Sequence, residues 1–105
     1  MNSRKFENLS NVTGKNIQKY RKLNGWSRVM LSNKLMLLGI DINYDSIYKI
    51  ENNRRIVKDF ELAAFAKVFN ITATELLEDF NKKLDKWQQG LSLLSKVDKY
   101  QFIHF

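Results

Sequence analysis

Apolar and polar positions along the first three quarters of the chain repeat one helix-start pattern. An apolar residue precedes a residue that can cap free backbone amides, and a second apolar residue follows at the fourth helical position. Four segments match: Val12-Thr13 with Ile17, Trp26-Ser27 with Leu31, Ile42-Asn43 with Ile47, and Ile71-Thr72 with Leu76. A fifth start, near Val57-Lys58 with Leu62 as the apolar partner, has acidic residues in its first turn instead of a capping side chain. Such residues suit the helix dipole.

The predicted helix ends agree with these starts. Gly25, Gly39, Asn53 and Asn70 follow the periodic segments, and Gly and Asn are the residues that most readily adopt the left-handed conformation after a helix. We predict helices at 14–24, 27–38, 43–52 and 58–69, and a fifth from 72 onward. No segment shows the alternation of a half-buried strand, so the predicted fold class is all-α.

Beyond residue 72 the apolar residues continue at spacings of four and three, the a/d pattern of a helix that packs along one stripe. The stripe consists of Ala73, Leu77, Phe80, Leu84, Trp87, Leu91 and Leu94. Gly90 lowers helix stability by about 1 kcal/mol relative to Ala, which favours a break there. The stripe needs a partner, which is either the body of its own domain or a second copy of the chain. The apolar stretch 97–105 is also unlike a solvated tail.

Composition limits the classes of protein to consider. A length of 105 residues with 44% hydrophobic residues suits one domain of 14–78, preceded by an N-terminal arm, 1–13, and followed by a C-terminal helical segment, 79–105. The chain has no Cys and one His, His104, so we expect no disulfide, metal or other cofactor. Neither a signal-peptide apolar region nor a membrane-length run is present, and the expected location is the cytoplasm.

The positive charge is concentrated in one half of the chain. The formal net charge is +7, from 18 Lys and Arg against 11 Asp and Glu. Residues 1–60 hold twelve of these basic residues and five acidic ones, whereas residues 61–105 hold six of each. A basic surface attracts an anionic polymer by releasing counterions, which favours nucleic acid as the partner. Charge that only keeps the chain soluble is the alternative.

The predicted helix at 43–52 is polar on its outer face. Ile47 and Ile50 mark its inner face, and Tyr44, Asp45, Ser46, Tyr48 and Lys49 point away from the core. A short helix that follows another helix after a turn can enter the DNA major groove, which is about 12 Å wide. An ordinary solvated helix face is the simpler interpretation of the same residues.

The run from Gly14 to Leu77 resembles the helix-turn-helix domain of the lambda-repressor-like (Cro/C1, or XRE) family of transcription regulators. The stretches that carry the resemblance are GKNIQKYRKLNGWS, LSNKL, SIYKIENNRR and FELAAFAKVFNITATELL. The resemblance implies a five-helix DNA-binding domain whose third helix reads base edges. This sequence differs from most members of that family in having Arg28 in place of Gln, Asn53 in place of Gly, and a longer connection at 38–42.

The family's roles transfer to this sequence by position. The resemblance implies base contacts from Tyr44, Asp45, Tyr48 and Lys49, phosphate contacts from Arg28, Ser46, Asn52, Arg54 and Arg55, and a structural ion pair between Arg21 and Glu51. Lys can donate to guanine and Asp can accept from the cytosine amino group. Asp45 otherwise stands close to phosphates that repel it. A charged loop is the alternative for Arg54 and Arg55.

These observations favour a sequence-specific regulator of double-stranded DNA, expected to be a repressor and a homodimer. The alternative is a protein-interaction module, such as the antitoxin of a toxin-antitoxin pair, that binds its partner through the apolar C-terminal segment. For Phe80, Leu84, Trp87, Leu91 and Leu94, packing within the chain and contact with a partner are both open. No nucleophile-base pair, paired carboxylates or phosphate-binding Gly-rich loop indicates an enzyme.

Overall fold

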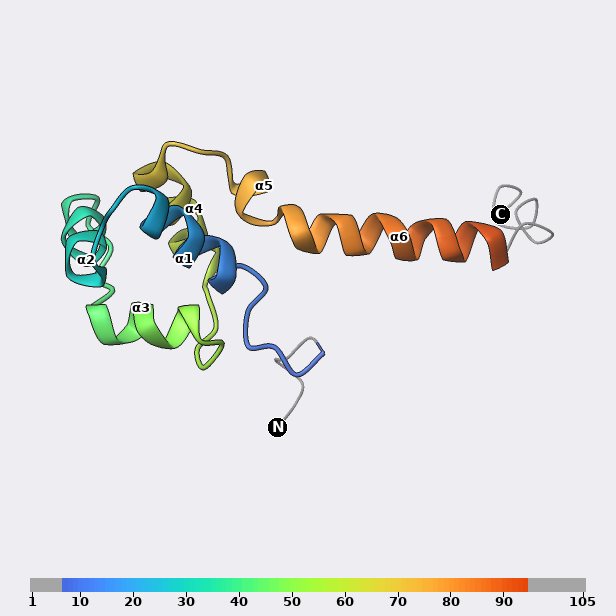
Figure 1. The fold of residues 1–105 in the computed structure, drawn as a ribbon, viewed down its shortest axis with the longest axis horizontal. Coiled ribbons are helices and arrows are strands. Elements are labelled where there is room, and N and C mark those ends of the chain that lie inside the picture. Colours follow the sequence, from blue (N-terminus) through green and yellow to red (C-terminus); the bar gives the residue numbers. More distant parts are fainter. Residues whose placement is uncertain (1–6, 95–105) are drawn as a thin grey trace.

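A computed structural model of the chain describes the backbone of residues 7–94 and the side chains of residues 7–91. This part is all-helical and contains no strand. The first four helices and a short fifth form a body, from which the sixth extends (Figure 1). The helices are α1 (Gly14–Leu23), α2 (Arg28–Leu37), α3 (Tyr44–Glu51), α4 (Asp59–Phe69), α5 (Ala73–Leu76) and α6 (Glu78–Leu94). The predicted all-α class is confirmed, and the first four predicted helices begin and end within one residue of those observed.

The helix starts are capped at three of the four predicted positions. Ser27, Asn43 and Thr72 accept hydrogen bonds from the backbone amides of Met30, Ser46 and Glu75. All four apolar partners of the start pattern, Ile17, Leu31, Ile47 and Leu76, are fully buried. The pattern therefore identifies the apolar residue that each of these helix starts buries.

Thr13 does not cap α1, contrary to the sequence prediction. Its backbone is already helical, with φ −113° and ψ −11°, so its hydroxyl does not face the free amides. The hydroxyl is buried and has no hydrogen-bond partner among the described residues. The Asn11 side chain instead accepts from the Gly14 amide at 2.7 Å.

The predicted helix ends hold in the structure. Gly25, Gly39, Asn53 and Asn70 all have positive φ, from 57° to 79°. This left-handed conformation allows the chain to leave each helix and turn into the next connection.

The single fifth helix predicted from residue 72 onward is wrong. The chain breaks at Leu77, so that α5 is one short turn and α6 begins again at Glu78. Leu76 is fully buried against the core, and that contact fixes α5 on the body while α6 points away (Figure 1). The a/d spacing runs across the break unchanged, so periodicity alone does not reveal it. The expected break at Gly90 does not occur, because α6 continues through it.

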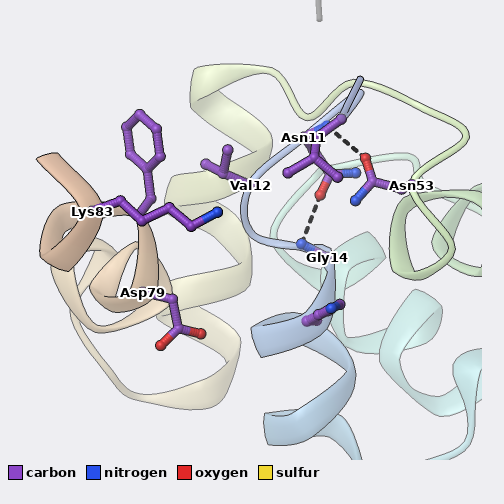
Figure 2. Close-up of a pocket in the computed structure, with 9 residues that line it drawn as sticks. Asn11, Val12, Gly14, Asn53, Asp79 and Lys83 are labelled. Atoms are coloured by element: carbon purple, nitrogen blue, oxygen red, sulfur yellow. Dashed lines mark hydrogen bonds between the residues drawn. The ribbon is translucent and has the colours of Figure 1, made fainter. Parts of the chain in front are cut away.

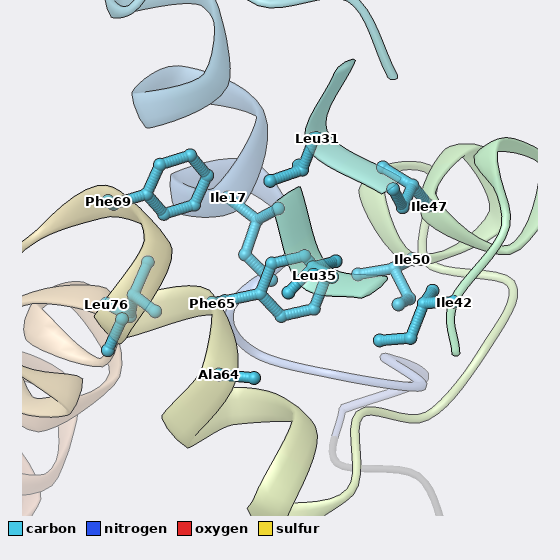
Figure 3. Close-up of a cluster of buried hydrophobic side chains, with 11 residues drawn as sticks. Ile17, Leu31, Leu35, Ile42, Ile47, Ile50, Ala64, Phe65, Phe69 and Leu76 are labelled. Atoms are coloured by element: carbon cyan, nitrogen blue, oxygen red, sulfur yellow. The ribbon is translucent and has the colours of Figure 1, made fainter. Parts of the chain in front are cut away.

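The core lies where α1, α2, α3 and α4 meet (Figure 3). Its members are apolar side chains of these helices, of α5 and of the α2–α3 connection: Ile17, Leu31, Leu35, Ile42, Ile47, Ile50, Ala64, Phe65, Ala66, Phe69 and Leu76. Ile42 explains how the longer connection is ordered, because its side chain is 1% exposed and its carbonyl accepts from the Ser32 hydroxyl at 2.6 Å. The extra residues therefore add to the core that positions α3.

The segment before α1 is tied to the end of α3. The Asn53 side chain accepts from the backbone amides of Ser10 and Asn11, and Asn11 donates to the carbonyls of Ile50 and Arg55 at 2.9 and 2.8 Å. Figure 2 shows Asn11 between Asn53 and Gly14, beside a pocket that the start of α6 also lines. These bonds fix the α3–α4 connection against the start of α1.

Gly14 is required by this close approach. A Cβ on Gly14 would overlap the Ile50 carbonyl oxygen and lie 2.8 Å from Asn11 Oδ1. The Ile50 carbonyl belongs to the backbone, and the Asn11 side chain is held by hydrogen bonds to Ile50, Arg55 and Gly14.

We predict that Gly14→Ala lowers the free energy of unfolding by about 1–3 kcal/mol, because α1 must move away from α3. The control is Gly90→Ala, since a Cβ at Gly90 meets nothing within 4 Å and Ala is the better helix former. Urea denaturation of the two variants measures the difference. Equal stability of both variants would contradict the close-packing argument.

Candidate nucleic-acid interface

The outer face of α3 displays four of the predicted contact residues together. Tyr44 and Tyr48 are 59% and 40% exposed, and the side chains of Asp45 and Lys49 are about half exposed. Ile47 and Ile50 are fully buried on the opposite face. Helix period thus separates a face that anchors α3 from a face that can meet a ligand.

Asp45 and Lys49 form an ion pair on this exposed face. Lys49 Nζ lies 3.1 Å from Asp45 Oδ2, one helical turn apart. An exposed pair of this kind contributes only about 0.3–0.5 kcal/mol, so it can rearrange when a ligand arrives.

A buried carboxylate holds α3 against the two preceding helices. Arg21 donates from Nε to Glu51 Oε2 at 2.7 Å and from a terminal nitrogen to Oε1 at 3.0 Å. Arg28 Nε also donates to Glu51 Oε1, at 3.0 Å. The Glu51 side chain is fully buried. The Arg21–Glu51 pair that the resemblance implies is therefore present in the structure, and Arg28 joins it.

Arg28 is held from two sides at the start of α2. Besides its bond to Glu51, its guanidinium carbon lies 5.0 Å from the centre of the Tyr48 ring. The side chain remains 31% exposed. Tyr48 therefore has a second role beside the predicted base contact, because its ring supports a guanidinium at the edge of the α3 face.

Arg55 is engaged within the domain. Its two terminal nitrogens each donate to one Glu61 oxygen at 2.9 Å, and one also donates to the Ile56 carbonyl. Hydrogen bonding to Glu61 raises the pKa of Arg55, and hydrogen bonding from Arg55 holds the pKa of Glu61 below its usual value although burial acts in the other direction. The same carboxylate accepts from the Lys58 amide at 3.0 Å and so caps α4.

The remaining predicted phosphate contacts lie at both ends of α3: Ser46 is in its first turn, and Asn52 and Arg54 follow its last residue. Arg54 is exposed, and its guanidinium has no hydrogen-bond or ion-pair partner among the residues that the structure describes. Asn52 donates from its side chain to the Tyr48 carbonyl, and Ser46 is half-buried with its amide capped by Asn43. The sequence analysis did not predict the contact between Asn11 and Asn53. The one signal for it was Asn53 itself, a polar residue at a position expected to have positive φ.

Residues 7–94 were also searched for a ligand pocket, a metal site and a membrane-spanning helix. The pocket in Figure 2 is lined by side chains already engaged in the fold: Asn11 and Asn53 hold backbone groups, and Lys83 pairs with Glu7 at 3.3 Å. No group of three His, Cys, Asp or Glu side chains in this part of the chain could hold a metal ion. None of the described helices has the length and apolar composition to cross a bilayer.

The C-terminal stripe is only partly visible in the described residues. Leu84, Trp87 and Leu91 are 41%, 40% and 65% exposed along α6, whereas Phe80 is half-buried where α6 meets the pocket. The side chain of Leu94 and the apolar stretch 97–105 lie outside the described residues.

We predict that the Arg55–Glu61 pair makes stability depend on acidity. A carboxylate with a depressed pKa stabilises the fold above its ordinary pKa of about 4.3, and this contribution is lost as the pH falls through the depressed value. Between about pH 5 and pH 3, Arg55→Gln should therefore lose less of its remaining stability than the wild type.

The matched control is Lys82→Gln, which removes an exposed pair with Glu78 at 3.2 Å. It should keep the wild-type pH dependence. Urea unfolding at a series of pH values measures all three proteins, and a wild-type slope in Arg55→Gln would contradict the role assigned to this pair.

Comparison with known proteins agrees with this geometry. A family model described as helix-turn-helix matches residues 17–76. No curated protein and no solved structure matches the chain.

Proposed function

The chain belongs to the helix-turn-helix family of Cro/C1-type DNA-binding regulators, and from this premise we propose that it is a sequence-specific repressor that binds double-stranded DNA as a homodimer. It would act in the cytoplasm, without catalytic activity. The observation that carries the proposal is the two-sided α3 helix, which buries Ile47 and Ile50 and exposes Tyr44, Asp45, Tyr48 and Lys49.

In this proposal, α3 lies in the major groove and its exposed residues contact base edges. Lys49 donates to guanine, Asp45 accepts from cytosine, and the Tyr44 and Tyr48 rings can pack on thymine methyl groups. The Glu51 network supports this arrangement because it fixes the orientation of α3 without taking part in reading.

Phosphate contacts come from residues at the margins of α3. Arg54 has the most available guanidinium, and Arg28 retains its terminal nitrogens for a phosphate while Nε stays on Glu51. Ser46 and Asn52 add shorter polar groups. Arg55 contributes less than its charge suggests, because its terminal nitrogens bond to Glu61.

Two substitutions distinguish base contact from phosphate contact. Lys49→Ala should weaken binding to the selected site by about 1–3 kcal/mol and relax the sequence preference, with little change on random duplex. Arg54→Ala should weaken binding to all duplexes alike and reduce the slope of log K against log salt concentration by about 1.

The experiment is selection of bound duplexes from a random pool, followed by titration of the selected and random duplexes at several salt concentrations. Equal losses on both duplexes for Lys49→Ala would argue against base reading. Recovery of no enriched sequence by the wild type would contradict the proposed function.

Homodimerisation would place two α3 helices about 34 Å apart, on successive major grooves of an approximate palindrome. The support is α6, which projects from the body, carries the a/d stripe and leaves Leu84 41% exposed. Figure 1 shows α6 extending from the body away from α3, so α6 can meet another chain without covering the α3 face.

We predict that Leu84→Ser shifts the chain toward the monomer and weakens binding to a palindromic site more than to a half-site. Lys86→Ser, on the opposite side of α6, serves as the control and should remain dimeric. Sedimentation equilibrium and titration with both DNA lengths measure the effect. A wild-type chain that sediments as a monomer would contradict the homodimer and favour the alternative in which the stripe binds a different protein, as in an antitoxin.

A further inference from the structure

Asp45 is an unusual residue for a surface that meets DNA. It lies in the first turn of α3 on the exposed face, where its carboxylate would be repelled by phosphates. The structure places it 3.1 Å from Lys49 Nζ. The exposed charges of α3 therefore cancel, and α3 adds little to the general attraction between the protein and DNA.

The pair presents a donor and an acceptor side by side. A Watson–Crick pair presents a similar combination in the major groove, because the guanine O6 acceptor and the cytosine N4 donor are hydrogen-bonded to each other at about 3 Å. Lys49 and Asp45 can each meet the complementary group on one base pair, since the separation of their charged atoms, 3.1 Å, is close to this spacing.

A·T presents the same donor and acceptor side by side, so the groups next to them must distinguish A·T from G·C. On G·C, the second acceptor of guanine, N7, lies beside O6, where an ammonium gains a further hydrogen bond. On A·T, an ammonium at thymine O4 meets the methyl group, and a carboxylate at adenine N6 lies beside the N7 acceptor, which repels it. The donor-acceptor pair therefore fits G·C better than A·T.

We propose that Asp45 and Lys49 act as one unit that reads a G·C base pair, with Asp45 as a specificity-determining residue. The inference rests on the proposed function. In it, Asp45 accepts from the cytosine amino group while the neighbouring Lys49 donates to guanine.

Asp45→Asn tests the assignment. The side-chain amide keeps the size of the residue but prefers adenine, to which it can bond through N6 and N7. In random-duplex selection the variant should lose the wild-type preference for G·C at one position in each half-site and gain one for A·T there. Discrimination at that position should change by roughly 5- to 150-fold, and other positions of the site should stay unchanged.

The matched control is Asp41→Asn. Asp41 is exposed in the connection before α3 and has no ion-pair partner in residues 7–94. Both variants remove one negative charge near α3, so both should bind random duplex more tightly, by about the same factor. Only Asp45→Asn should change the preferred base. Circular dichroism checks that both variants keep the wild-type helix content.

Three results would overturn the proposal. An unchanged motif with Asp45→Asn, or a wild-type preference for A·T at the position that responds to Asp45, would overturn the paired reading and leave the proposed function standing, because a motif is still recovered. A wild-type protein that enriches no motif would overturn the proposed function and this inference with it.

Discussion

The Glu51 carboxylate is the group on which the arrangement of the first three helices depends. It ends α3, its side chain is fully buried, and it accepts from Arg21 of α1 and Arg28 of α2. A buried carboxylate is costly unless hydrogen-bonded charges compensate it, and loss of one partner leaves the remaining charges buried and unpaired. The network therefore stabilises one orientation of α3 over others in which the helix is rotated about its axis. Arg21 also donates to the Trp26 carbonyl at 2.9 Å, which extends this constraint to the α1–α2 connection.

Local chemistry accounts for the features that could be predicted from the sequence. Ser27, Asn43 and Thr72 cap their helices because capping depends on residues three positions apart, and Gly39 and Asn70 end theirs because few residues tolerate positive φ. The break at Leu77 could not be predicted in the same way. It follows from burial of Leu76 against a core assembled by distant segments, and the spacing of apolar residues is the same on both sides of it.

In the candidate site, too, local features could be predicted from the sequence, whereas contacts between distant segments could not. Helix period identifies the exposed face of α3, because Ile47 and Ile50 fix its inner side. The partners of the basic residues depend on contacts between segments: Arg28 lies 23 residues from Glu51 in sequence, and Asn11 lies 42 residues from Asn53. The family resemblance supplied the Arg21–Glu51 pair, whereas nothing in the spacing of residues pointed to the Arg28 contact with Tyr48.

These contacts change what the net charge of the basic half means. Pairing leaves the sum of charges unaltered, but it determines which basic groups already have a carboxylate beside them. Lys49 faces Asp45, Arg55 faces Glu61, and Arg21 is buried on Glu51. Arg54 and the exposed part of Arg28 remain at the margin of α3. General attraction to DNA then comes from the margins, whereas the centre of the face is electrically balanced. In the proposed complex with DNA, such a surface gains little from a random duplex and gains most where base edges match its donors and acceptors.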